Sequence, residues 1–234
     1  MVSVMEFDYK AWQHVFKLDP AKTISDEDLA AVCESGTDAI IVGGTDNITL
    51  DNVLDLLVRV RRYAIPVMLE ASALDAVTPG FDSYGIPVVL NSTEAKWITG
   101  MHQKALKEYG DILVWEELIA EGYCVLNPDC KVATLTKAKT ALDVEDVRAY
   151  ARMAEQFFAL PIFYMEYSGQ YGDVAKVRAA KDVLTKTRLF YGGGIATLAQ
   201  AEEMKAVADT IVVGNVIYED LKAALSTVKV KNTL

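Results

Sequence analysis

The sequence predicts a single (β/α)8 (TIM) barrel domain over residues 1–234, and three observations lead to that α/β fold class. Eight short apolar segments recur along the chain, and amphipathic helical patterns separate most of them. The apolar segments are nearly continuous rather than alternating, as in parallel strands buried on both faces. No linker rich in proline, glycine or serine divides the 234 residues, a length that suits one barrel.

The eight apolar segments are the expected strands, and each is of ordinary strand length. They are His14–Leu18, Asp38–Val42, Pro66–Ala71, Pro87–Asn91, Tyr123–Asn127, Pro161–Tyr167, Arg188–Tyr191 and Thr210–Val213. The repeated order of strand, helix and strand predicts right-handed parallel crossovers.

Helical patterns between these strands carry their own start and stop signals. Ser25 and Asp28 form a capping signal for a helix that ends before Gly36. Apolar residues over Leu50–Val58 line one helical face, and Thr93–Tyr109 is expected to be a longer helix. Further helical faces are expected over Val144–Ala154 and Val174–Val183.

Two segments depart from the regular alternation. Ser72–Ile86 contains Pro79, Gly80 and Gly85 and shows no sustained helical face, so the third helix is expected to be short or missing. A short extra helix is expected over Trp115–Glu121, before the fifth strand.

Composition restricts the classes of function. The formal net charge is −10, from 23 Lys and Arg against 33 Asp and Glu, which argues against a general binder of nucleic acid or anionic membranes. The amino-terminal region lacks the apolar core of a signal peptide, and no apolar run reaches the roughly 18 residues of a transmembrane segment. Cys33, Cys124 and Cys130 show no C-x-x-C spacing. Reduced thiols in a soluble, cytoplasmic protein are therefore expected.

The most informative feature is a pair of glycine turns near the carboxyl end. Gly192–Gly194 follows the seventh expected strand, and Gly214–Asn215 follows the eighth. Glycines let backbone N–H groups approach a ligand closely, and the loops after strands seven and eight of such barrels bind phosphate. We therefore expect one end of the substrate to carry a phosphate.

Candidate catalytic groups follow the first two strands. Lys17 and Asp19 are two residues apart, so both can face the barrel mouth, where they suit a phosphate and a divalent metal. A structural Lys–Asp pair would give the same pattern. After the second strand, Thr45 follows Gly43 and Gly44 and offers a hydroxyl group, although this segment is also ordinary turn chemistry.

The sixth strand brings a carboxylate to the same mouth. Tyr164 and Glu166 alternate to one face, and a carboxylate at the end of a buried strand is costly without a partner. Glu166 is thus a candidate general base and Tyr164 a phosphate or hydroxyl contact, with a salt-bridged structural Glu166 as the alternative. His14 and His102 are expected to be structural.

These segments together resemble the geranylgeranylglyceryl phosphate synthase family, and most closely its bacterial PcrB branch. The resemblance runs over nearly the whole chain and rests on Phe16–Pro20, Gly43–Asp46, Tyr164–Gly169, Tyr191–Ile195 and Gly214–Asn215. It also includes Cys33–Asp38, Met101–Lys104 and Glu121–Cys124.

The resemblance implies a Mg²⁺-dependent prenyltransferase that joins a long polyprenyl diphosphate to the hydroxyl of sn-glycerol 1-phosphate through an ether bond. By resemblance, Asp19 and Thr45 would bind Mg²⁺, and Glu166 would be catalytic. The residues that would hold glycerol 1-phosphate are Lys17, Tyr164, Met165, Glu166, Tyr167, Ser168, Gly169, Gly194, Gly214 and Asn215.

Chain length is expected to depend on the helix over Thr93–Tyr109. The archaeal branch carries a bulky aromatic residue there, whereas the corresponding residue here is Ala105. A small side chain would let a longer tail pass, so a C35 heptaprenyl donor is favoured over C20. The alternative is that Ala105 is simply a good helix former.

Two other classes of function share parts of this pattern. A phosphosugar isomerase, epimerase or lyase would use the same phosphate cradle but would lack an apolar groove leading away from it. A non-catalytic partner-binding module would leave Asp19 and Glu166 without a purpose. The resemblance also implies a homodimer.

Overall fold

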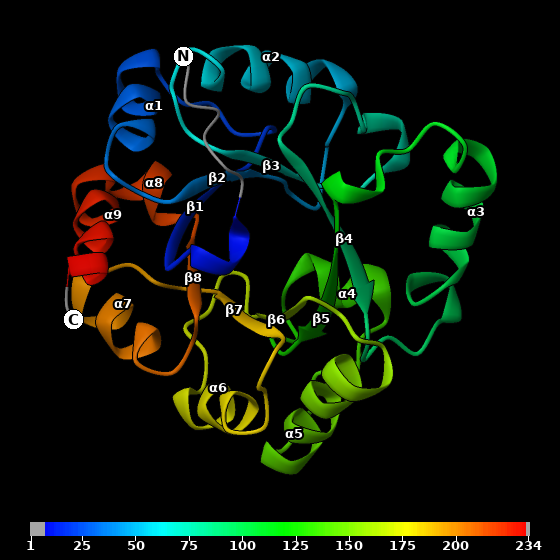
Figure 1. Ribbon diagram of the computed structural model, residues 1–234. Coiled ribbons are helices and arrows are strands. Elements are labelled where there is room, and N and C mark those ends of the chain that lie inside the picture. Colours follow the sequence, from blue (N-terminus) through cyan, green and yellow to red (C-terminus); the bar gives the residue numbers. More distant parts are fainter. Residues whose placement is uncertain (1–7, 233–234) are drawn as a thin grey trace.

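The computed structural model describes residues 8–232, which form a closed barrel of eight parallel strands (Figure 1). Each strand pairs with its neighbours in sequence order, and β8 pairs with β1. This confirms the predicted (β/α)8 barrel. The strands are β1 (His14–Leu18), β2 (Ala39–Val42), β3 (Val67–Glu70), β4 (Ser83–Val89), β5 (Leu118–Val125), β6 (Ile162–Glu166), β7 (Arg188–Gly192) and β8 (Thr210–Val213).

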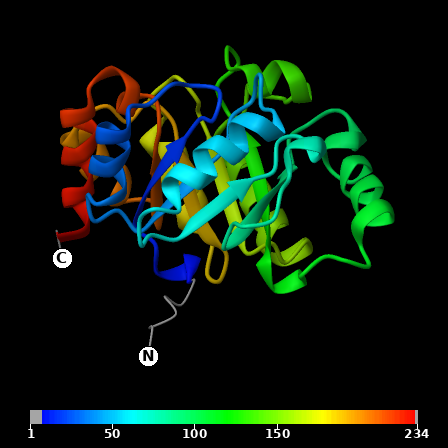
Figure 2. The ribbon, with the colours of Figure 1, turned by 90° about the horizontal axis from the view of Figure 1, so that it is seen from above.

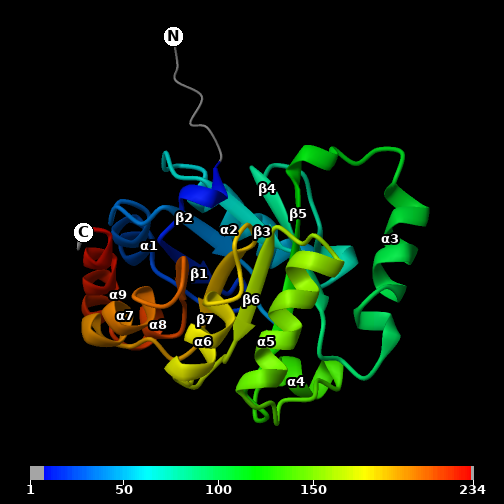
Figure 3. The same cartoon turned by 60° about the horizontal axis from the view of Figure 1, so that its bottom comes forward.

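Helices surround the strands on the outside of the barrel (Figures 1 and 3). They are α1 (Asp26–Cys33), α2 (Leu50–Val60), α3 (Gly100–Tyr109), α4 (Lys131–Thr136), α5 (Val144–Arg152), α6 (Val174–Lys181), α7 (Leu198–Lys205), α8 (Val216–Glu219) and α9 (Leu221–Thr227). The predicted capping signal is confirmed, because Ser25 Oγ accepts a hydrogen bond from the backbone N–H of Asp28.

Alternate residues of each strand belong to two different layers. In β6, Ile162 and Tyr164 pack inside the barrel, whereas Phe163 and Met165 pack outward against the helices. In β1, Val15 points inward and Phe16 outward, so Lys17 shares the inner side with Val15. The period of two therefore delivers Lys17, Tyr164 and Glu166 to the barrel interior, as predicted.

The connection between β3 and β4 lacks an α-helix, as predicted for Ser72–Ile86. It contains the 3-10 helix Leu74–Ala76 and the turn around Gly80, whose φ angle is +113°. The last four residues of the predicted irregular segment belong to β4 instead, which begins at Ser83.

The predicted bounds of the fourth and fifth strands are wrong. β4 starts four residues before Pro87, and β5 starts at Leu118, inside the segment predicted to be an extra helix. Only the 3-10 helix Trp115–Glu117 precedes it. Tyr84 pairs with Leu118 and Pro87 with Glu121, so ladder pairing between the strands overrides the local helical pattern.

The helix predicted over Thr93–Tyr109 divides into two parts. A 3-10 helix covers Ala95–Trp97, and α3 follows from Gly100. No residue of α3 is buried, and this helix stands apart from the strands in the view from above (Figure 2). α3 is therefore the least tightly packed of the helices that flank the barrel.

The three cysteines are buried and free, in agreement with the predicted reduced thiols. Within residues 8–232, no helix is both long enough and apolar enough to cross a lipid bilayer.

Candidate active site

Two glycine turns lie next to each other at the carboxyl ends of β7 and β8. Gly193 and Gly194 have φ angles of 148° and 58°, which would strain any residue with a side chain. A Cβ atom on Gly194 would collide with the backbone of Tyr171 in the loop after β6. Gly214 follows β8 and leads into α8. These two turns, called the cradle below, lie at the position where (β/α)8 barrels bind phosphate, and a phosphate held there stays a prediction.

Tyr191 fixes the loop after β6 to the loop after β7. Its side chain is fully buried, and its hydroxyl accepts a hydrogen bond of 2.7 Å from the Gly172 N–H. The same hydroxyl donates to the Gly193 carbonyl over 2.7 Å. The shape of the cradle thus depends on a side chain beneath it.

Lys17 is the cation on the inner wall of this site. Its Nζ lies 2.6 Å from Oε1 of Glu70 at the end of β3 and 5.8 Å from the ring centroid of Tyr164. Burial opposes the charged form of Lys17, but the carboxylates of Glu70 and Glu166 outweigh it and raise the pKa of Lys17. Lys17 is therefore protonated at neutral pH.

Glu166 is the carboxylate at the end of β6, and it is buried. Its Oε1 accepts hydrogen bonds from the N–H of Ser168, over 2.5 Å, and from the Ser168 hydroxyl, over 2.6 Å. Burial raises the pKa of Glu166, and the Lys17 charge and the Ser168 hydrogen bonds offset part of that rise. A raised pKa suits a general base near neutral pH.

Asp19 and Thr45 lie at the same mouth, after β1 and β2. The backbone N–H of Asp19 donates to the hydroxyl of Tyr218 over 2.9 Å, and Asp19 Oδ1 accepts from the Ala21 N–H. A Cβ atom on Gly44 would lie 2.7 Å from Asp19 Oδ1, so the glycine leaves room for this carboxylate. Thr45 follows Gly44 and is exposed.

One cavity of about 160 Å³ joins these groups at the mouth of the barrel. The predicted site residues that line it are Lys17, Asp19, Thr45, Tyr164, Glu166, Ser168, Gly169, Gly194, Gly214 and Asn215. Met165 and Tyr167 do not line it, because their side chains pack in the outer layer. The structure thus brings together groups from β1, β2, β6, β7 and β8.

Some polar residues of this region were not singled out from the sequence. Glu70 contacts Lys17, and Tyr123 donates a hydrogen bond to Glu70 Oε2. Tyr218 supports Asp19. Glu121 lies fully buried in the barrel interior with no hydrogen-bond partner for either carboxylate oxygen. Burial and the nearby charge of Glu70 raise the pKa of Glu121 well above its ordinary value.

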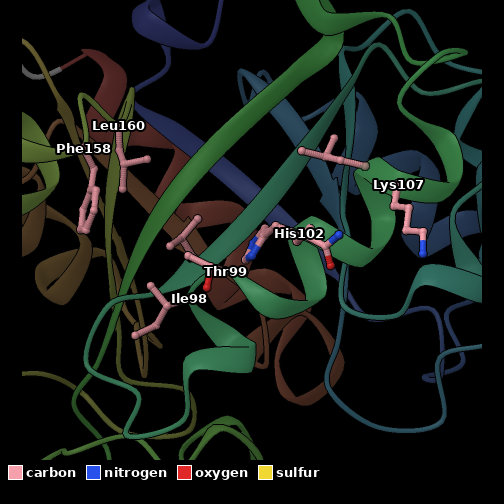
Figure 4. Close-up of a pocket in the computed structure, with 9 residues that line it drawn as sticks. Ile98, Thr99, His102, Lys107, Phe158 and Leu160 are labelled. Carbon is pink, nitrogen blue, oxygen red and sulfur yellow. The ribbon is translucent and has the colours of Figure 1, made fainter.

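A second, larger cavity of about 670 Å³ lies outside the barrel wall, beneath α3. Figure 4 shows Phe158 and Leu160 on one side and Ile98, Thr99 and His102 on the other. The remaining lining residues are Val88, Gln103, Leu106 and Lys107. Val88 lies near the carboxyl end of β4, and Leu160 precedes the start of β6. Val88 pairs with Gly122 on β5, and Leu160 packs over Gly122, so this mainly apolar cavity lies against the outer faces of β4 to β6 and shares no lining residue with the cavity at the mouth.

Ala105 does not line this cavity. It lies half-buried on α3, three residues after His102. Residues three apart on a helix are neighbours on its surface, so a bulky side chain at position 105 would crowd His102.

The fold and these two cavities define a class of protein: a (β/α)8 barrel with two glycine turns and a carboxylate at its mouth and an apolar cavity on its outer wall. Residues 7–232 match the PcrB family. The chain belongs to the PcrB family, and it is a prenyltransferase.

Relatives and solved structures agree with this assignment. A heptaprenylglyceryl phosphate synthase of Lysinibacillus sphaericus (strain C3-41) is 67% identical over 228 residues, which cover 97% of this chain and 100% of the relative. The enzyme of the same name from Geobacillus sp. (strain WCH70) is 60% identical, covering 95% and 98% of the two chains. The fold also matches a crystal structure of (S)-3-O-geranylgeranylglyceryl phosphate synthase from Thermoplasma acidophilum in complex with substrate sn-glycerol-1-phosphate. That match has a TM-score of 0.84 and 26% identity, and it covers 96% of this chain and 94% of that one.

Proposed function

We propose that this prenyltransferase joins a polyprenyl diphosphate to the primary hydroxyl of sn-glycerol 1-phosphate, with Mg²⁺ as the metal and C35 heptaprenyl favoured over C20. The observation that supports this reaction is the pairing of two cavities. A polar one holds the cradle, Lys17 and Glu166, and an apolar one extends along the outer wall. The Thermoplasma enzyme of similar fold was crystallised with sn-glycerol-1-phosphate, which supports the choice of acceptor.

The cradle and Lys17 would hold the phosphate of the acceptor. Backbone N–H groups around Gly194 and Gly214 and the ammonium of Lys17 offer donors on neighbouring walls of one cavity. Asn215, Tyr164, Ser168 and Gly169 complete these walls. Met165 and Tyr167 would contribute through their backbone, since their side chains point outward.

Glu166 would receive the proton of the acceptor hydroxyl. The carbon–oxygen bond to the diphosphate breaks, the glycerol oxygen forms the new ether bond at that carbon, and its proton passes to a carboxylate oxygen of Glu166. Holding the phosphate end of the acceptor aims the hydroxyl at the reacting carbon. Excluding water from the site would prevent water from attacking that carbon in place of the glycerol hydroxyl.

The residues present fit a bound magnesium ion. Mg²⁺ usually takes one or two protein carboxylates and completes its coordination with water and substrate phosphates. Asp19 offers a carboxylate and Thr45 a hydroxyl on the same rim. In residues 8–232 no group of three or more His, Cys, Asp or Glu side chains could hold a metal ion. When bound there, Mg²⁺ would neutralise the leaving diphosphate.

The apolar cavity would hold the polyprenyl tail. Burial of hydrocarbon is worth about 0.8 kcal/mol per CH₂ group. The binding free energy from an apolar wall therefore grows with the length of the chain that it covers. Ala105 carries a small side chain one helical turn from His102, which lines this cavity, and this favours the C35 donor. A phosphosugar isomerase, epimerase or lyase would have no use for this cavity.

The homodimer and the cytoplasmic location are part of the same proposal. Phe157 and Phe158 are exposed after α5, at 83% and 45% of their surface, and two exposed aromatic side chains are typical of an interface. Three free buried thiols suit a reducing compartment. Sedimentation velocity tests the dimer: a mass of twice 25.7 kDa is expected.

A transfer assay tests the reaction. Radiolabelled sn-glycerol 1-phosphate is incubated with heptaprenyl diphosphate and Mg²⁺, and label is followed into an organic extract. We expect a metal-dependent ether lipid, none after chelation with EDTA, and little with sn-glycerol 3-phosphate. Failure of transfer with every prenyl donor would overturn the proposal and direct attention to phosphosugar substrates.

A further inference from the structure

Lys17 and Glu70 form an ion pair between strands that are not neighbours. Lys17 lies on β1 and Glu70 on β3, and β2 runs between these strands. Nevertheless Lys17 Nζ and Glu70 Oε1 are 2.6 Å apart. The two side chains therefore meet in front of β2, on the inner side of the barrel.

Gly43 at the end of β2 makes this meeting possible. A Cβ atom at this position would lie 2.9 Å from Glu70 Cβ, 3.3 Å from Glu70 Oε1 and 3.5 Å from Lys17 Cε. The first of these separations is shorter than real Cβ contacts allow. The missing side chain of Gly43 thus leaves room for the pair, in addition to any role in ligand approach.

The second oxygen of Glu70 is held from another strand. The hydroxyl of Tyr123 on β5 donates a hydrogen bond to Glu70 Oε2. The Tyr123 ring stacks on Tyr164 with centroids 4.5 Å apart and an interplanar angle of 9°. Each oxygen of Glu70 therefore has one partner, and Glu70 itself is only 7% exposed.

Lys17 keeps donors for a ligand while it is held in this way. An ammonium group has three N–H donors, and the structure assigns one to Glu70. Lys17 also lines the mouth cavity. A lysine side chain is long and flexible, so a fixed partner reduces the entropy lost when it binds an anion.

We propose that Glu70 and Tyr123 are positioning residues that hold the ammonium of Lys17 at the cavity wall for the phosphate of the acceptor substrate. This inference rests on the proposed function, which places that phosphate in the cradle. Neither residue touches the reacting atoms. Their contribution is to acceptor affinity rather than to the chemical step.

The test compares isosteric variants with the intact enzyme. Binding of sn-glycerol 1-phosphate and of inorganic phosphate is measured by calorimetry, and KM and kcat are measured for both substrates. For Glu70→Gln we expect acceptor affinity to fall about tenfold, the size of effect that the loss of a hydrogen bond to a charged group produces. The kcat value and the KM for the polyprenyl diphosphate should change less than about twofold. The reason is that losing an interaction made equally in the ground state and the transition state weakens binding and leaves kcat unchanged.

Tyr123→Phe should produce a smaller loss in the same direction. Because Tyr123 acts through Glu70, it should add nothing in the Glu70→Gln background. Glu121→Gln is the matched control: Glu121 lies in the same interior but makes no hydrogen bond, so acceptor affinity should not change. Thermal unfolding of each variant shows whether the barrel remains folded.

The outcomes separate this inference from the proposed function. If the intact enzyme binds acceptor and Glu70→Gln binds it equally well or more tightly, Glu70 does not position Lys17 and the inference is overturned. A kcat that falls as much as the acceptor affinity would also contradict it. If the intact enzyme binds neither sn-glycerol 1-phosphate nor inorganic phosphate, the proposed function fails and this inference with it.

Discussion

The carboxylate of Glu166 accepts a hydrogen bond of 2.6 Å from the hydroxyl of Ser168, two residues later in the chain. The backbone N–H of Ser168 donates to the same oxygen. Oε1 of Glu166 is therefore occupied by Ser168, and we expect Oε2 to be the oxygen that receives a proton from the substrate.

Replacing Glu166 by Gln should lower kcat by about 10²–10⁴-fold, the usual contribution of a general base. In the intact enzyme kcat should fall as the pH drops through the pKa of Glu166, which burial raises above its ordinary value. Ser168→Ala removes a hydrogen bond that lowers this pKa, so the acid limb should move to higher pH. A pH–rate profile checks both points, and an unchanged profile in Ser168→Ala would contradict the assignment.

Replacing Asp19 by Asn should raise the Mg²⁺ concentration needed for half-maximal activity by at least about tenfold, because even outer-sphere changes cost that much. The measurement is a Mg²⁺ titration of transfer activity. Asp46→Asn is the control, since Asp46 is exposed, pairs with Lys131 and does not line the cavity. Equal Mg²⁺ requirements in the two variants would show that Asp19 is not a metal ligand.

Ala105→Trp should reduce turnover of the C35 donor by about tenfold or more while C20 turnover survives, a ratio that steric exclusion from an apolar pocket can reach. The reason is crowding of His102 on the inner side of α3. Lys104→Trp places the same bulk on an exposed neighbouring position and should leave both donors unaffected. Unchanged C35 turnover in Ala105→Trp would exclude Ala105 as the residue that sets chain length.

His14 should make the free energy of unfolding depend on pH in the acidic range. Its ring nitrogens lie 2.9 Å from the hydroxyls of Thr37 and Thr227, and burial lowers its pKa from 6.5 to about 3. The unfolded chain therefore binds more protons between these values, and the free energy of unfolding should fall as the pH drops from about 6.5 toward 3. Urea unfolding across this range should show a weaker decline in His14→Gln but the same decline in His102→Gln.

Glu155 should stabilise the segment that leads into the amino-terminal end of β7. Its carboxylate accepts hydrogen bonds from the N–H groups of Thr185, Lys186 and Thr187 and from the Thr185 hydroxyl. Burial opposes the charged form, but these bonds prevail and lower the pKa of Glu155 to about 2. The contribution of Glu155 to the free energy of unfolding is therefore present above pH 4.5 and is lost as the pH falls toward 2.

Glu155→Gln should lower the free energy of unfolding by about 1–3 kcal/mol at neutral pH, the cost of leaving buried N–H groups poorly paired. Glu145→Gln is the control, because Glu145 is exposed and forms an ion pair with Arg148 on the surface of α5. Denaturant titration of the two variants checks the difference. Equal free energies of unfolding for the two variants would show that the hydrogen bonds from the three N–H groups to Glu155 do not stabilise the fold.

The sequence predicts most of the barrel because its strands are short, apolar and bounded by clear turn signals. It misplaces the fourth and fifth strands, where Gly85, Pro87 and Glu121 contradict strand propensity. Gly85 fits because a Cβ atom there would collide with the Glu121 carboxylate. Only the closed barrel shows that these residues complement each other.

A residue of the candidate site can be predicted from the sequence when its position at the end of one predicted strand is sufficient to identify it. Lys17, Glu166 and the glycine turns are found from their position after apolar segments. Glu70 is not, because its partner Lys17 is 53 residues away and the two meet across a strand that neither belongs to. Such relations depend on tertiary geometry and leave no local pattern in the chain.

The most direct test of the central claim is a competition between donors. C20 and C35 prenyl diphosphates are offered together at equal concentration with sn-glycerol 1-phosphate and Mg²⁺, and the ether lipids are identified by mass. The account predicts a metal-dependent heptaprenyl ether as the main product. A geranylgeranyl ether as the main product would contradict the chain-length claim, and the absence of any ether lipid would contradict the proposed reaction itself.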